Sequence, residues 1–129
     1  MAKATARIQK DPYRTEIESA SANVLVADEP LSAGGKDVGF APKELLAAAL
    51  SSCTAITLRM YVEKKGWETG EITVETTLEE EEGKCVFVRK LTFEAPLEEE
   101  QKARLTAIAD ACPVHKILAG TIDFKTTVS

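Results

Sequence analysis

The main helix of the chain is predicted over residues 42–66, which read PKELLAAALSSCTAITLRMYVEKKG. Pro42 suits the first helical turn, and Gly66, after two lysines, suits the C-terminal end. Apolar side chains recur at spacings of three and four residues, as they do on a buried helix face. The predicted face comprises Leu46, Ala49, Leu50, Cys53, Ile56, Thr57 and Met60. Together with the slim run of residues 47–49, the pattern predicts a central helix packed on more than one side.

Strands are predicted on both sides of this helix, and further helices follow it. Alternating apolar residues predict strands, whereas a period of three to four predicts helices. The predicted elements are two or three short strands in residues 5–28, a loop to residue 41, a hairpin of residues 71–78 and 84–93 with an acidic turn at 79–83, helices at 98–111 and 113–119, and a last strand at 121–128. This order predicts one α+β domain, residues 1–129, with a mainly antiparallel sheet.

Charge and composition exclude several classes of protein. The formal net charge is −5, so neither nucleic acid nor an anionic membrane surface is expected as a partner. The first residues lack the apolar core of a signal peptide, and no apolar run is expected to reach the length of a membrane span. The chain is therefore expected to be soluble and cytoplasmic, with no membrane partner.

Three cysteines and one histidine are the residues that suggest chemistry. No CxxC pair occurs, and His115 is the only histidine, so no metal site is expected. Cys112 precedes Pro113, where a helix start would favour a thiolate, with His115 within reach of the same turn. Cys112 is otherwise a buried apolar residue, and Cys53 by itself is a small hydrophobe on a helix face. Cys85 is expected to be structural.

Several short motifs resemble the OsmC/Ohr family of bacterial thiol peroxidases, in the same order over nearly the whole chain. The motifs are DEP at 28–30, GG at 34–35, APKELLAAALSSCTA at 41–55, MY at 60–61, KKGW at 64–67 and ADACPVH at 109–115. The resemblance is specific around Cys53 and around Cys112, and weak over the first 25 residues. It implies an OsmC-like fold in an intertwined homodimer, with the long central helix in the core and active sites at the subunit interface.

The resemblance also implies an activity and the residues for it. Cys53 is similar to the cysteine that attacks the peroxide, and Cys112 to the resolving cysteine that closes a disulfide. A small thiol or a dithiol of the lipoyl type is then the reductant, and no metal, flavin or haem cofactor is needed. Local sequence favours Cys112 as the more acidic thiol, because of the helix dipole. The resemblance implies an arginine partner for Cys53, and a desolvated arginine lowers a neighbouring pKa more than a helix dipole does. Cys53 is therefore predicted to react first.

Two charged groups complete the site that the resemblance implies. In that family, a glutamate directly after the proline pairs with an arginine from the N-terminal strands, and the two groups activate the attacking thiolate. The glutamate position holds Lys43 in this chain, and the nearest carboxylate is Glu44. Arg14 is the candidate arginine, with Arg7 as the reserve, and His115 is a further group that could tune the site.

The predicted function is thiol-dependent reduction of organic, and also inorganic, hydroperoxides. Two alternatives from other classes stay open. One is a binding module that holds an apolar, lipid-like ligand near Cys53 with idle cysteines. The other is a thiol-based transferase or hydrolase built on Cys112 and His115, for which no third orienting group is evident.

Overall fold

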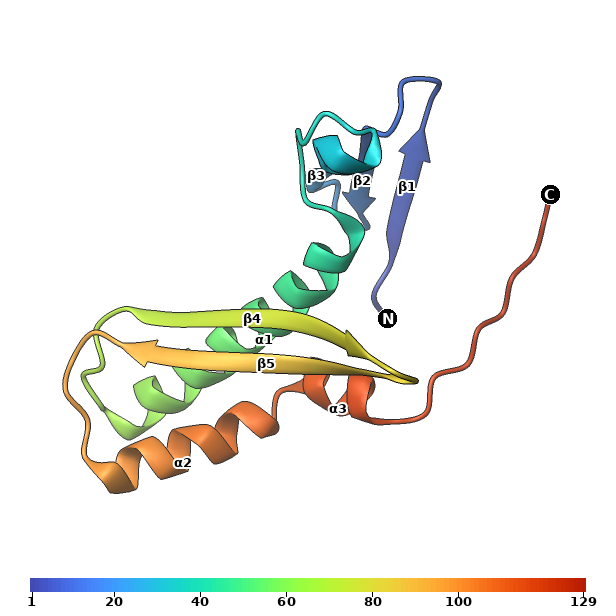
Figure 1. Cartoon of the computed structure of the whole chain (residues 1–129). Helices are drawn as coiled ribbons and strands as arrows, with labels where there is room; N and C mark the ends of the chain where they lie inside the picture. Colours follow the sequence, from blue (N-terminus) through green and yellow to red (C-terminus); the bar gives the residue numbers. More distant parts are fainter. The chain divides into compact units, whose positions relative to one another are not determined.

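The computed structural model describes residues 1–129 and has the α+β class that the sequence predicts. Two compact units, residues 1–46 and 47–129, are described separately below. The elements in chain order are β1 (Ala4–Ile8), β2 (Thr15–Ser19), β3 (Val24–Ala27), η1 (Leu31–Ala33), α1 (Pro42–Lys65), β4 (Ile72–Glu81), β5 (Lys84–Phe93), α2 (Glu99–Asp110) and α3 (Pro113–Ala119) (Figure 1). The organisation as one domain stays a prediction.

The first unit holds a three-stranded antiparallel sheet in the order β1-β2-β3, so the predicted short strands are confirmed. Ile17 on β2 lies between Ala6 on β1 and Leu25 on β3. The loop after β3 is organised by the buried carboxylate of Asp28. This carboxylate accepts hydrogen bonds from the backbone N–H groups of Glu29 (2.8 Å), Lys36 (3.2 Å), Val38 (3.2 Å) and Tyr13 (3.3 Å). At its far end, the loop also pairs with β3 through a parallel bridge between Phe40 and Ala27.

Helix α1 begins and ends where the sequence predicts. Pro42 occupies the first helical position, where its missing N–H costs no hydrogen bond. The Glu44 side chain accepts a hydrogen bond from the backbone N–H of Ala41 at 2.9 Å, which satisfies a donor before the first turn. After Lys65, Gly66 adopts a left-handed φ of 70° that few other residues tolerate.

The predicted buried face of α1 is partly wrong. The buried residues form a stripe four residues apart, namely Leu50, Thr54, Leu58 and Val62. Ile56 is 55% exposed and Met60 66% exposed in this chain, and Leu46 is also exposed. Apolar residues occur on two sides of this helix, so periodicity alone could not identify the side that packs within the chain.

The expectation that no apolar run reaches the length of a membrane span is wrong for this helix. By length and composition alone, α1 could cross a membrane. Its buried stripe instead packs inside the second unit, where Leu58 and Val62 contact Leu105 and Ala109 of α2. Partly buried side chains of the hairpin strands β4 and β5 cover the same cluster.

The hairpin of β4 and β5 is confirmed, with a turn shorter than predicted. The antiparallel register runs from Ile72 opposite Phe93 to Glu81 opposite Lys84. The turn is only Glu82 and Gly83, and Gly83 has a φ of 71°. Residues 79–81 of the acidic run therefore extend β4. All three side chains are exposed to solvent, and Glu81 lies opposite Lys84, with which it forms an ion pair at 3.9 Å.

The two later helices are confirmed, but the predicted last strand is wrong. Helix α3 covers Pro113–Ala119 as predicted, and residues 121–129 form no strand. Phe124 is 88% exposed and Val128 is 95% exposed, because no strand in this chain pairs with the segment. The chain buries seven hydrophobic residues and exposes sixteen large ones.

Candidate active site

Two cysteines that are 59 positions apart lie together in the second unit. Cys53 is half-buried on α1, and Cys112 is completely buried in the residue before α3. Their sulfur atoms are joined by a hydrogen bond. Both thiols are free, so the structure describes the reduced protein.

The local fold around Cys112 explains its position. The backbone N–H of Cys112 donates to Ala109 O at the end of α2, at 3.3 Å. Its carbonyl oxygen accepts the N–H of Lys116 at 3.1 Å, which starts α3. Pro113 follows in the first turn, where its fixed φ suits a helix start. The corner between α2 and α3 therefore turns the Cys112 side chain toward α1.

The pKa values of the two thiols move in opposite directions. Burial by itself raises the pKa of Cys112, but hydrogen bonds from Cys53, from the backbone N–H of His115, from the Thr54 hydroxyl and from the backbone N–H of Val114 outweigh it and lower the value below 9.0. Burial raises the pKa of Cys53, and the Cys112 sulfur raises it further. Cys112 is therefore the more acidic thiol of the pair.

Arg89 is a site residue that the sequence reasoning missed. This side chain is 13% exposed and projects from β5 toward both later helices. Its Nη1 donates to Thr54 Oγ1 at 3.0 Å and to Ala109 O at 2.9 Å, and its Nη2 to Asp110 Oδ1 at 3.0 Å. The alternation of β5 gives a signal that could have found it, because Arg89 falls on the same face as the inward-facing Leu91 and Phe93.

His115 contacts Arg89 through its side chain and Cys112 through its backbone. His115 Nδ1 lies 2.7 Å from Arg89 Nη2 and 3.9 Å from Asp110 Oδ1. Because a guanidinium only donates, Nδ1 must accept at 2.7 Å, and the ring hydrogen is on Nε2. An ion pair with Asp110 through Nδ1 would need a hydrogen on that same nitrogen. The shorter contact therefore defines the tautomer.

An apolar hollow of about 380 Å³ adjoins the site. Leu50, Phe87 and Leu118 contribute apolar walls, while Arg89 and His115 line the hollow with polar groups. The exposed thiol of Cys85 also lines it. Such a hollow suits a small organic molecule that carries one polar end.

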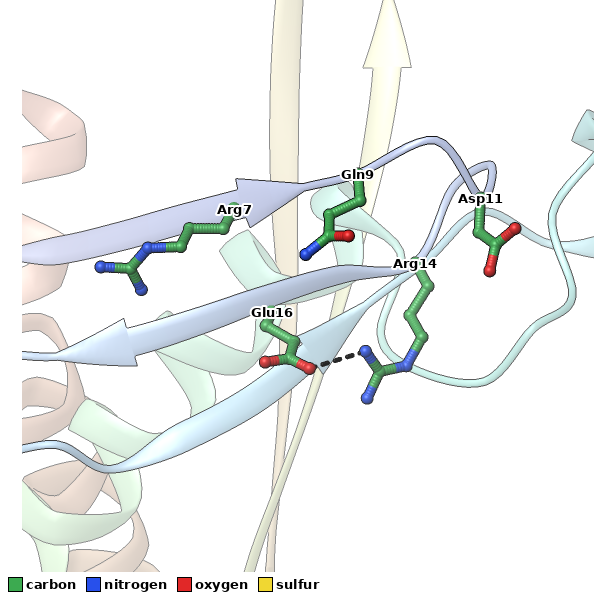
Figure 2. Close-up of a pocket in the computed structure, with 5 residues that line it drawn as sticks. All are labelled: Arg7, Gln9, Asp11, Arg14 and Glu16. Carbon is green, nitrogen blue, oxygen red and sulfur yellow. Dashed lines mark hydrogen bonds and ion pairs between the residues drawn. The ribbon is translucent and has the colours of Figure 1, made fainter.

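The other predicted site residues lie in the first unit. Arg14 and Arg7 line a polar hollow of about 280 Å³ with Gln9, Asp11 and Glu16 (Figure 2). Arg14 pairs with Glu16 at 2.8 Å, and the Glu44 carboxylate caps α1. Their roles at Cys53 stay predictions. No three His, Cys, Asp or Glu side chains of the chain gather in an arrangement that could hold a metal ion.

Comparison with known proteins shows the family to which the chain belongs. The OsmC-like protein family model matches residues 34–127. A search of curated proteins finds no match. Among solved structures, a protein of Psychrobacter arcticus 273-4, provisionally described as an osmotic stress induced and detoxification response protein, is 25% identical, with a TM-score of 0.78 over 91% of this chain and 88% of its own.

Two further structures share the fold at lower identity. The organic hydroperoxide resistance protein OhrB of Bacillus subtilis is 24% identical, with a TM-score of 0.65 over 95% of this chain and 93% of its own. An OsmC-like protein of Mycoplasma pneumoniae is 18% identical, with a TM-score of 0.72 over 93% of this chain and 88% of its own. Because the family model covers most of the sequence, the chain belongs to the OsmC-like protein family.

Proposed function

We propose that the protein is a thiol-dependent peroxidase that reduces organic hydroperoxides with Cys53 and Cys112. The observation that carries this proposal is the hydrogen bond between the two sulfur atoms, with the pKa of one thiol lowered and that of the other raised. A thiolate beside a second thiol is the arrangement that can attack a peroxide and then close a disulfide. The name of OhrB, an organic hydroperoxide resistance protein with this fold, agrees with the proposal.

The reaction divides into two balanced steps. The Cys53 sulfur attacks the peroxide oxygen, the O–O bond breaks, and Cys53 becomes a sulfenic acid while the alkoxide leaves and takes a proton to form the alcohol. The Cys112 thiolate then attacks the Cys53 sulfur and expels hydroxide, which is protonated to water. A small thiol or a dithiol of the lipoyl type reduces the resulting disulfide and restores both thiols.

Accessibility favours Cys53 as the attacking sulfur, although Cys112 is the more acidic one. Cys53 is half-buried, whereas Cys112 has no exposed surface. The hydrogen bond offers a route for the proton, because the Cys112 thiolate can accept the Cys53 proton as the peroxide approaches. Cys112 thus acts first as the base, then passes this proton to the leaving alkoxide, and the regenerated Cys112 thiolate resolves the sulfenic acid.

Other parts of the proposal come from the family. We place the protein in the cytoplasm as a homodimer, with Arg14 and Glu44 as the groups that assist Cys53 and Arg7 as the reserve. The apolar hollow beside Arg89 and His115 suits the organic part of a hydroperoxide better than hydrogen peroxide.

Peroxide consumption by matched cysteine variants tests the proposal. Wild type with a dithiol reductant should consume cumene hydroperoxide, and Cys53→Ser should lose this activity. A sulfenic-acid trap should label Cys53 in Cys112→Ser and leave Cys112 nearly unlabelled in Cys53→Ser. Labelling in the opposite pattern would reverse the two roles, and a wild type that consumes no hydroperoxide would refute the proposal.

A binding function is the second candidate, because the hollow is lined mainly by apolar side chains. Native mass spectrometry that finds a retained apolar ligand, with no peroxide consumed, would favour it. A hydrolase or transferase built on Cys112 and His115 has less support, because His115 Nδ1 is already engaged by Arg89.

A further inference from the structure

Arg89 connects every element that supplies a group to the thiol pair. From β5 it reaches Thr54 on α1, Ala109 and Asp110 at the end of α2, and His115 on α3. We propose that Arg89 is the positioning residue of the site, which aims the Thr54 hydroxyl at the Cys112 sulfur and fixes the His115 ring as its Nε2–H tautomer. This inference deepens the proposed peroxidase function and rests on it for its purpose.

The Thr54 hydroxyl is the link between Arg89 and the sulfur. Thr54 is completely buried, and its oxygen accepts a hydrogen bond from Arg89 Nη1 at 3.0 Å. Since that oxygen accepts from the guanidinium, the hydroxyl hydrogen remains free to donate, and it donates to Cys112. A hydroxyl that accepts from a cation becomes a stronger donor, so Arg89 strengthens the contact to a Cys112 thiolate.

The charges around the site are arranged for an anion at Cys112. Arg89 carries a buried positive charge, and Asp110 from α2 neutralises part of it at 3.0 Å. Lys84 on β5 lines the same hollow from an exposed position, and Cys53 from α1 donates a hydrogen to Cys112. The neutral His115 tautomer leaves the guanidinium contact free of repulsion at 2.7 Å. The remaining positive charge is buried, where charges act over a distance with less screening than in water.

The test follows the Cys112 thiolate without any peroxide. In a Cys53→Ser, Cys85→Ser background Cys112 is the only thiol, and the serine hydroxyl at position 53 keeps a donor beside it. Absorbance at 240 nm then reports thiolate formation against pH. Thr54→Val removes the hydrogen bond from the Thr54 hydroxyl to the Cys112 thiolate, and Arg89→Gln removes the group that positions this hydroxyl. Each substitution should therefore raise the midpoint of Cys112 ionisation by about one to two pH units.

Matched variants separate positioning from charge and from folding. Thr54→Ser keeps the hydroxyl and should restore the parent midpoint, and Arg89→Lys should restore part of it. Arg104→Gln, which removes the same charge from an exposed position on α2, should leave the midpoint unchanged. Far-UV circular dichroism checks that each variant is folded.

The single histidine gives a second readout. Nitrogen NMR of ¹⁵N-histidine protein should show the Nε2–H tautomer in wild type, and Arg89→Gln should produce a mixture of tautomers. The proposal is overturned by a folded Thr54→Val variant with the parent midpoint, by an equal shift in Arg104→Gln, or by an Nδ1–H tautomer in wild type. If Arg89→Gln fails to fold, Thr54→Val and the wild-type tautomer still decide. Absence of peroxide consumption by wild type would refute the proposed function alone, since the titration needs no peroxide.

Discussion

The exposed apolar side of α1 predicts a dimer that single substitutions weaken. Ala49, Ile56 and Met60 follow one another at helical spacing on this side, and Ile56 and Met60 are 55% and 66% exposed. Replacing Ile56 by alanine removes most of the Ile56 side chain, which a second copy would cover. Since a two-fold interface repeats every contact, each substitution acts twice in the dimer.

The magnitude follows from the exposed fractions. Complete burial of a large aliphatic side chain stabilises by about 1.5–3 kcal/mol, and Ile56 has just over half of its surface left to bury, which gives about 1 kcal/mol per chain. Ile56→Ala should therefore cost about 2 kcal/mol per dimer, or about thirtyfold in the dimer Kd. Ile56→Ala with Met60→Ala should cost about 4 kcal/mol.

Sedimentation equilibrium over a range of concentrations measures the dimer Kd directly. Val88→Ala is the matched control, because Val88 is 46% exposed but lies on β5, opposite Thr77. The control should keep the wild-type Kd. A wild type that sediments as a monomer at micromolar concentration, or an equal loss in Val88→Ala and Ile56→Ala, would refute the reasoning.

Three further predictions concern the core, the loop and the thiols. Leu58→Ala should lower the free energy of unfolding by about 3 kcal/mol in urea titrations, because Leu58 is completely buried, and a loss under 1 kcal/mol would contradict this packing. Burial by itself raises the pKa of Asp28, but four backbone hydrogen bonds lower it below 3.8. The ionised Asp28 carboxylate therefore stabilises the folded state fully above the unfolded pKa, and this stabilisation is lost as the pH falls through the folded pKa. Asp28→Asn should therefore flatten the acid side of the stability curve, whereas the exposed Asp11→Asn should not. In wild type, peroxide consumption should rise with pH as the Cys112 base ionises, with a midpoint below 9.0. In Cys112→Ser only Cys53 ionises at the site, and the midpoint should move upward because burial raises the pKa of Cys53.

Local signals in the sequence were sufficient for most elements. Pro42 and Gly66 mark the ends of α1, and Pro113 marks the start of α3, because proline and glycine act on the backbone at their own positions. The strand predicted at residues 121–128 was wrong because alternation describes the side chains of a strand and not its hydrogen-bond partner.

The site was harder to predict because its contacts join distant parts of the chain. The cysteines could be paired from the family resemblance, and the structure brings their sulfur atoms together. The partners of Arg89 could not be assigned, since they lie 20 to 35 positions away in the sequence. A charged residue on the inward face of an alternating strand is the one local signal of such a contact.

The distribution of apolar side chains has a consequence for how the protein must be handled. A chain that exposes sixteen large hydrophobic residues and buries seven hydrophobic ones would gain stability from any partner that covers the exposed ones. If a second copy is the cover, folding and assembly are one equilibrium, and the melting temperature depends on dilution. Each tenfold dilution then removes about 1.4 kcal/mol per dimer. Thermal stabilities of variants are therefore comparable only at equal protein concentration, and in a cell the abundance of the protein would itself set how much of it stays folded.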